Sequence, residues 1–191
     1  KQLTHRAGIN ADILVGGVGN DTLNGNEGDD TLDGGTGDDR MTGGRGDDTY
    51  VIDSEGDVAI EPYDLSEGSY EDGIDTVLAS ISYTVHDNIE RVFLQGTADL
   101  NATGGIEENV LVGNAGANIL LGSGPDQWFH YDDWLDGGAG NDVLITTWGG
   151  DTLIGGEGDD YMEGSGGGDL YFVDSVGDVV VESIEEVGGS R

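Results

Sequence analysis

A nine-residue repeat is the feature that most restricts what this chain can fold into. Residues 16–51 divide into four consecutive units, GGVGNDTLN, GNEGDDTLD, GGTGDDRMT and GGRGDDTYV, with weaker copies at 7–15 and 52–60. Each unit has Asp at position six and an apolar or small residue at position eight. A flexible linker has no reason to keep two residues in phase, so the pattern predicts a solenoid of stacked repeats.

A second array of the same period occupies residues 128–181. Its units read WFHYDDWLD, GGAGNDVLI, TTWGGDTLI, GGEGDDYME, GSGGGDLYF and VDSVGDVVV. The two arrays end alike, with IDSEGDVAIE in the first and VDSVGDVVVE in the second. We therefore expect two related stacks, each closed by a capping unit that lacks the glycines of a full turn.

The period suggests how the units stack. We interpret each unit as a six-residue turn followed by a three-residue strand whose position eight points inward. Two units then make one coil, and residues 18 apart lie on neighbouring coils at about 4.8 Å, the spacing of adjacent strands. This places Asp12 over Asp30 and Asp21 over Asp39. Bare carboxylates at that distance repel by about 3 kcal/mol per pair at an effective dielectric constant near 20, so the empty stack should not form.

Calcium between the turns would reverse this repulsion. Its bonds to oxygen are about 2.3–2.6 Å long, close to half the layer spacing, and it takes six to eight oxygen ligands. Glycines at positions one, two and four would permit positive φ and let backbone carbonyls approach the ion. Magnesium keeps its waters and zinc prefers nitrogen and sulfur, so both fit less well. The chain has no Cys at all.

Pairing position six of alternate units gives about eight calcium sites, which would reduce the formal charge from −34 to roughly −18. The pairs are Asp12/Asp30, Asp21/Asp39, Asp30/Asp48, Asp39/Asp57, Asp133/Asp151, Asp142/Asp160, Asp151/Asp169 and Asp160/Asp178. The glycines expected to shape these turns are Gly17, Gly19, Gly28, Gly35, Gly37, Gly44, Gly46, Gly138, Gly140, Gly149, Gly156, Gly158 and Gly167.

The pattern G-G-x-G-x-D-x-U-x resembles that of the repeats-in-toxin (RTX) family of secreted bacterial proteins. This resemblance covers the two arrays. It implies an all-β fold, a right-handed parallel β-roll or β-helix with Ca²⁺ in its turns. It also implies secretion as an unfolded chain through a one-step export machine, with folding triggered by calcium outside the cell. The chain would then be a non-catalytic segment of a larger RTX polypeptide.

The charge balance excludes several partners. Binding to nucleic acid or an anionic membrane surface needs clustered Lys or Arg, and the chain has 6 Lys+Arg against 40 Asp+Glu. No apolar run reaches the roughly 20 residues of a membrane span, so we expect no membrane insertion. The first residues carry no secretory signal and no Met, which favours a fragment of a longer protein.

Between the arrays the repeat weakens. We divide the chain into a first array with its cap at 7–61, a strand-rich, partly solenoidal connector at 62–103, a second array at 104–182 and a truncated tail at 183–191. Asn109 and Asn118 stand at the ligand position of a degenerate start. A neutral amide offers a cation less than a carboxylate does, so we expect weak calcium or none at those turns.

Residues 122–136, GSGPDQWFHYDDWLD, interrupt the second array. We interpret this interruption as a three-residue deletion whose bulge is filled by large side chains. The alternative is that Trp128, Trp134 and Trp148 form an adhesive or carbohydrate-binding surface. No H-E-x-x-H or G-x-S-x-G motif occurs, so the chain is expected not to be an enzyme. An accessory role beside the catalytic domain of a protease, lipase or epimerase stays open.

Overall fold

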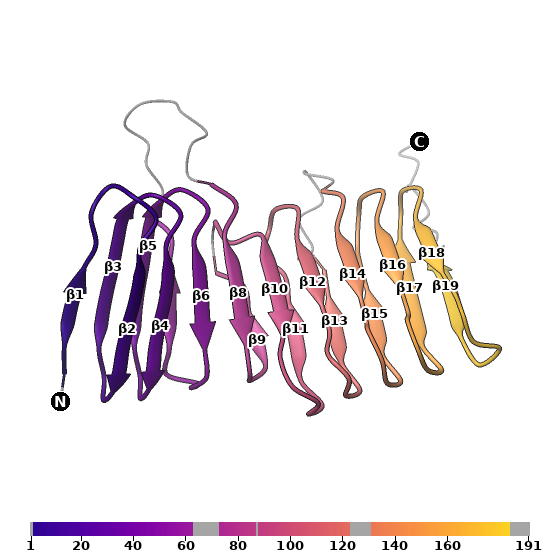
Figure 1. The fold of residues 1–191 in the computed structure, drawn as a ribbon. Coiled ribbons are helices and arrows are strands. Elements are labelled where there is room, and N and C mark those ends of the chain that lie inside the picture. Colours follow the sequence, from indigo (N-terminus) through magenta and orange to yellow (C-terminus); the bar gives the residue numbers. More distant parts are fainter. Residues whose placement is uncertain (1, 63–72, 87, 123–130, 184–191) are drawn as a thin grey trace, which may run out of the picture. The chain divides into compact units, whose positions relative to one another are not determined.

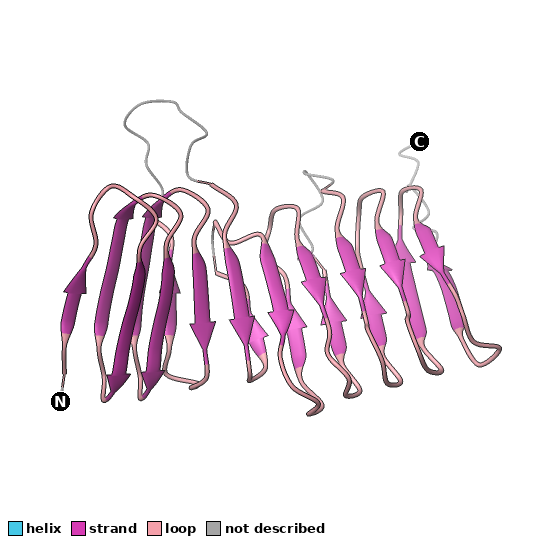
Figure 2. Cartoon of the chain, in the orientation of Figure 1, coloured by secondary structure: helices cyan, strands magenta, loops and turns pink. Residues whose placement is uncertain are grey.

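The computed structural model describes residues 2–62, 73–86, 88–122 and 131–183. Within these residues every regular element is a β-strand (Figure 2). None of them belongs to a helix that is long and apolar enough to cross a membrane. The chain forms two compact units, Lys1–Gly96 and Thr97–Arg191, and each is taken separately below.

The first unit is a parallel β-solenoid (Figure 1). Consecutive strands alternate between two sheets, one in the order β1-β3-β5-β7 and one that includes β2-β4-β6-β8-β10. Its strands are β1 (Thr4–Arg6), β2 (Ile13–Val18), β3 (Thr22–Glu27), β4 (Thr31–Thr36), β5 (Arg40–Arg45), β6 (Thr49–Ile52), β7 (Val58–Ile60), β8 (Thr76–Ala79), β9 (Tyr83–Thr84) and β10 (Arg91–Leu94).

The register of strands β1 to β7 is the predicted one. Strand β2 pairs with β4 through Leu14↔Leu32, and β3 pairs with β5 through Leu23↔Met41, so partners are 18 residues apart. The strands β2 to β5 are longer than the three residues expected. Each has six residues and continues into the glycines of the following turn. Two nonapeptides therefore make one coil, as the period requires.

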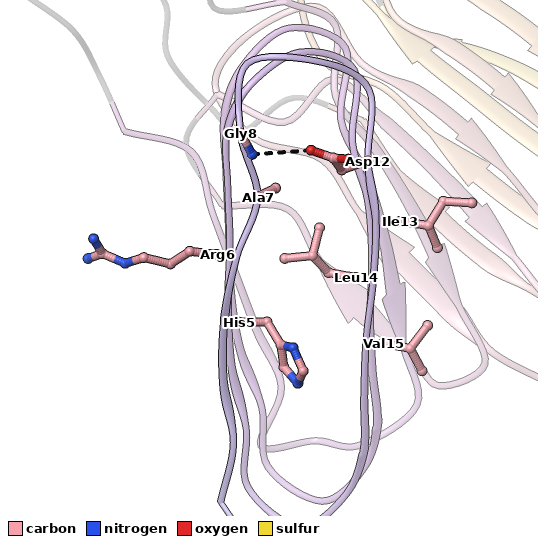
Figure 3. A pocket seen from close by; sticks show the side chains of 8 residues that line it. All are labelled: His5, Arg6, Ala7, Gly8, Asp12, Ile13, Leu14 and Val15. Carbon is pink, nitrogen blue, oxygen red and sulfur yellow. Dashed lines mark hydrogen bonds between the residues drawn. The ribbon is translucent and has the colours of Figure 1, made fainter.

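Alternation within each strand produces the core. Figure 3 shows the first coil with Leu14 and His5 pointing between its two strands, and with Ile13, Val15 and Arg6 pointing outward. The inward residues at position eight form a buried column that comprises Leu14, Leu23, Leu32, Met41, Tyr50 and Ala59. Each of the strands β2 to β5 buries one apolar side chain, which makes a narrow core there, so apolar burial alone gives these coils limited stability.

The second unit repeats this architecture. One sheet runs β11-β13-β15-β17-β19 and the other includes β12-β14-β16-β18. Leu111, Leu120, Leu135, Leu144 and Leu153 are fully buried, so the solenoid includes the segment in which the repeat is degenerate. The strands are β11 (Asn101–Thr103), β12 (Val110–Val112), β13 (Ile119–Leu121), β14 (Trp134–Asp136), β15 (Val143–Ile145), β16 (Thr152–Ile154), β17 (Tyr161–Ser165), β18 (Leu170–Phe172) and β19 (Val179–Ser183).

The interpretation of the break at 122–136 as a deletion is wrong. Strand β12 pairs with β14 through Leu111↔Leu135, and β13 pairs with β15 through Leu120↔Leu144, so both pairs are 24 residues apart. One half coil between β13 and β14 therefore contains six extra residues. Register on both sides of the insertion is preserved because the pattern of inward residues specifies it. Residues 123–130 of this break, Trp128 among them, lie outside the described residues.

The last layer departs from the predicted burial. Tyr171 and Val180 stand at position eight, yet Tyr171 is only partly buried and Val180 is 43% exposed. Their strands, β18 and β19, each pair on one side only among the described strands. Among the described strands, none covers the outer side of these two side chains. The tail at 183–191 lies outside the description apart from Ser183.

Candidate metal centres

The position-six aspartates stack in register along both units. The backbone N–H of Asp21 donates to Oδ1 of Asp39 at 2.6 Å, and the N–H of Asp30 donates to Oδ1 of Asp48 at 2.7 Å. The second unit repeats the contact between Asp142 and Asp160 at 2.7 Å. One oxygen of each such carboxylate therefore joins two layers. The structure brings together every pair that the sequence predicted.

The other carboxylate oxygen of most of these residues is buried without a hydrogen-bond partner. Leaving a buried polar atom unpaired costs roughly 1–3 kcal/mol, and more when it is charged. A row of unpaired anionic oxygens of this kind is suited to binding cations. The atoms concerned are Oδ2 of Asp21, Asp30, Asp39, Asp48, Asp142, Asp151, Asp160 and Asp169.

The glycine at position one leaves space beside these oxygens. A Cβ built on Gly16 would lie 2.6 Å from the carbonyl oxygen of Gly34 and 2.8 Å from Oδ2 of Asp21. The same space at Gly25 is bounded by Oδ2 of Asp30 and the carbonyl oxygen of Gly43. Carboxylate and carbonyl oxygens thus converge from two layers. This all-oxygen donor set is the chemistry that calcium prefers.

Glycines at positions two and four serve the stacking of the backbone. All the glycines predicted at these positions have positive φ, between 78° and 155°. A Cβ on Gly35 would also collide with the carbonyl oxygen of Gly17 one layer away, and a Cβ on Gly37 with that of Gly19. The expectation of positive φ at position one is wrong, because that glycine is needed for space in front of the carboxylate.

Burial raises the pKa of the stacked carboxylates. It raises the pKa of Asp48 to about 7 and that of Asp142 to about 7, from an ordinary value of 3.8. Burial also raises the pKa of Asp39, with neighbouring Asp57 and Asp21 contributing, although the hydrogen bond from the Asp21 N–H partly opposes the shift. Without a cation, the folded arrangement therefore favours protonated carboxylates.

A pH dependence of the metal-free protein follows. A carboxylate whose pKa is higher in the folded state stabilises the fold below its unfolded value of 3.8, and this stability is lost as the pH rises through about 7. We expect metal-free protein to gain β-structure when acidified from about pH 8 to about pH 4, as measured by far-UV circular dichroism. A loss of β-structure on acidification would contradict the burial of these groups.

Three predicted ligands have their second oxygen satisfied locally. Oδ2 of Asp12 accepts the N–H of Gly8 at 3.1 Å (Figure 3). Oδ2 of Asp57 accepts the N–H groups of Asp53 and Ser54, both at 3.0 Å. Asp178 repeats the arrangement of Asp57 in the second unit. The exit units thus orient their own Asp through backbone N–H groups of the same turn.

Asn109 and Asn118 differ from the stacked aspartates because the side-chain oxygen of each accepts a backbone N–H of its own turn. Oδ1 of Asn109 accepts the N–H of Gly105 at 2.7 Å. Oδ1 of Asn118 accepts the N–H of Asn114 at 2.8 Å, and its amide nitrogen donates to the carbonyl of Leu100, 18 residues away, at 2.7 Å. Asn118 therefore bridges two layers by a hydrogen bond. These turns need no cation to stack.

Sequence reasoning missed two acidic residues next to the first array. Asp75 accepts the N–H of Asp48 through Oδ1 at 2.8 Å, although the two residues are 27 positions apart. Oxygens of Asp48, Glu61 and Asp75 lie within 4.8 Å of one another, and all three residues are buried. The only sequence signal for Glu61 is that both exit motifs, IDSEGDVAIE and VDSVGDVVVE, end in Glu.

The known RTX calcium-binding nonapeptide repeat matches residues 7–41, 15–50, 103–124, 131–152 and 145–180, more than half of the chain. The chain belongs to this family. No curated protein matches the sequence. The match places the RTX repeat on both stacks of aspartates, so the described arrays form a calcium-binding β-roll.

The RTX residues fit calcium by their own geometry. The buried unpaired oxygens and the space beside the position-one glycines supply anionic and carbonyl donors from adjacent layers. The stacked Asp residues, with turn carbonyls beside them, are the groups that would hold the ions. Bound calcium would supply the positive charge that these buried oxygens otherwise lack.

The proposed aromatic surface is only partly described in this RTX chain. Trp128, Phe129 and His130 lie outside the described residues. Trp134 on β14 is 46% exposed. A Cβ on Gly166 would collide with the ring of Trp148, so that indole lies against the backbone of a turn. The carbohydrate-binding hypothesis stays a prediction.

Proposed function

We propose that this chain is a non-catalytic, calcium-dependent folding segment of a secreted bacterial RTX protein. The observation that supports this proposal best is the row of buried Oδ2 atoms that have no hydrogen-bond partner. They occur where the repeat stacks carboxylates between layers. In this proposal about eight calcium ions join the layers, and their binding free energy becomes folding free energy.

The dependence of folding on calcium also favours secretion. Intracellular calcium is far below the 10⁻⁴–10⁻³ M range of weak extracellular calcium modules, so the chain would stay unfolded in the cell. It would then pass an export machine as an extended chain and fold outside. The formal charge of −34 supports folding outside the cell and not inside it, because self-repulsion opposes compaction until cations bind.

Calcium stoichiometry of two Asp variants tests the site assignment. Asp39 contacts both Asp21 and Asp57 across layers, whereas Asp12 contacts Asp30 alone among the position-six aspartates. We therefore expect Asp39→Ala to lose two ions and Asp12→Ala to lose one, as counted by isothermal titration calorimetry. Equal stoichiometry in the two variants would reject the pairing of alternate units.

An adhesive role is the second candidate function, supported by the exposed indole of Trp134. A glycan screen of the calcium-loaded protein and of Trp134→Ala tests it. Binding that Trp134→Ala abolishes would support the adhesive role. Absence of binding, or binding that is unchanged by the substitution, would exclude this side chain as a carbohydrate contact.

A further inference from the structure

A cluster of three buried carboxylates closes the first array. Asp48 directly precedes β6, Glu61 directly follows β7, and Asp75 directly precedes β8. Their exposed fractions are 1%, 8% and 1%, and ligand oxygens of all three lie within 4.8 Å of one another. Strand β6 pairs with β8 through Thr49↔Thr76, which stacks Asp75 on Asp48. Glu61 adds a third carboxylate that the repeat does not supply.

One oxygen of Asp48 points into this cluster without a partner. Its Oδ1 accepts the N–H of Asp30, but its Oδ2 is buried and unpaired. A Cβ built on Gly43 would collide with this Oδ2, with Oε1 of Glu61 and with the hydroxyl of Tyr50. Three oxygens therefore surround one small space in front of Gly43. The unpaired atom indicates that something is needed there besides the protein's own donors.

Tyr50 holds Glu61 in position. Tyr50 stands at position eight, where the four preceding units have Leu or Met, and its hydroxyl donates to Oε1 of Glu61. The same hydroxyl accepts the N–H of Gly43 at 2.6 Å, and the N–H of Gly44 donates to Oε2 of Glu61 at 3.3 Å. Both oxygens of Glu61 are thereby fixed, which reduces the entropy lost when a cation binds.

The charges around the cluster make the ionised state costly without a cation. Burial is the largest influence and raises the pKa of Glu61 to about 8 and that of Asp75 to about 9. Asp48 and Glu90 raise both values further. Buried charges of one sign need a counter-charge or must be neutralised by protons.

The Asp–Tyr–Glu part of this arrangement recurs at the end of the second array, although Glu182 is exposed. Oδ2 of Asp169 is buried and unpaired, and the hydroxyl of Tyr171 donates to Oε2 of Glu182 at 2.7 Å. A Cβ on Gly164 would collide with both Asp169 and Tyr171. The spacing of Asp, Tyr and Glu is identical in the two arrays. Repetition of the Tyr–Glu hydrogen bond beside an unpaired Asp oxygen indicates that this contact is a regular feature of the array ends.

We infer that Asp48, Glu61 and Asp75 bind a divalent cation, with calcium the best fit to their all-oxygen donor set, at a site that shares Asp48 with the last repeat turn and adds two carboxylates from outside the repeat. This inference rests on the proposed function, since it assumes that calcium reaches the folded array. The cation links β6 to β8 where a 27-residue coil replaces the 18-residue one. Glu61 thus fixes the end of the roll where the glycine turn is interrupted.

Native mass spectrometry at saturating calcium tests the site by counting bound ions. Glu61→Gln should bind one ion fewer than the wild type and should need more calcium to fold. Glu55→Gln is the matched control, because Glu55 is exposed on the same exit segment and the charge change is identical. Asp75→Asn is the second variant, and it should stack because the side-chain amide of Asn118 links two layers by donating to the carbonyl of Leu100.

The outcomes separate this inference from the proposed function. An ion count in Glu61→Gln equal to that of Glu55→Gln would overturn the site and leave the repeat turns intact. A wild-type protein that binds no calcium would overturn both. If Glu61→Gln does not fold at any calcium concentration, Asp75→Asn decides: one ion fewer supports the site and a full count rejects it.

Discussion

In the absence of calcium, the protein is expected to show little β-structure by far-UV circular dichroism at neutral pH, and calcium at about millimolar concentration should restore it. The reason lies in the core and in the turns. Each strand from β2 to β7 buries one position-eight side chain, while the turns stack carboxylates that repel by about 3 kcal/mol per pair. Loss of the metal should therefore unfold the roll completely instead of loosening it.

Magnesium at the same concentration is the control for ionic strength and charge screening. It should restore little structure, because it dehydrates reluctantly and demands a strict octahedron. Addition of a chelator to the calcium-loaded protein should reverse the transition. A full β spectrum in chelator at neutral pH would refute the view that cations hold the layers together.

Gly35→Ala is expected to destabilise the calcium-loaded protein strongly. Gly35 has φ of 78°, and an added Cβ would also collide with the backbone carbonyl of Gly17 in the preceding layer. The left-handed conformation costs an Ala roughly 1–2 kcal/mol. The overlap adds about 1–3 kcal/mol, because a backbone oxygen cannot move away without breaking the register.

Gly17→Ala is the matched control for that substitution. Gly17 occupies the same repeat position and has φ of 99°, but nothing lies within 4 Å of its Cβ direction. It should show only the conformational cost. Thermal unfolding at saturating calcium measures both variants, and an equal loss of stability would show that layer contact at position two contributes nothing.

The repeat predicted the fold because its two constraints act over short distances. Position eight must point inward for burial, and position six must lie in the turn, so the 18-residue register of Leu14 on Leu32 follows from the period alone. The stacking of Asp21 on Asp39 follows in the same way. These contacts need no knowledge of how the rest of the chain is arranged.

Features that depend on irregular segments were not predictable from the period. Asp75 reaches Asp48 across a coil of 27 residues, and Glu61 lies outside the repeated phase. The break after β13 adds six residues to a half coil, yet spacing between glycines alone suggested a deletion. Only pairing of the strands on both sides reveals where an insertion leaves the solenoid and returns to it.

The exit turns give the roll a polarity. Oδ2 of Asp57 is held by N–H groups of its own turn, and its other oxygen, Oδ1, accepts the N–H of Asp39 in the layer before it. Such a turn can arrange itself before any neighbour has formed and then serve as a template for the adjoining coil. Growth should therefore start from the carboxyl-terminal side of each array and advance toward its beginning.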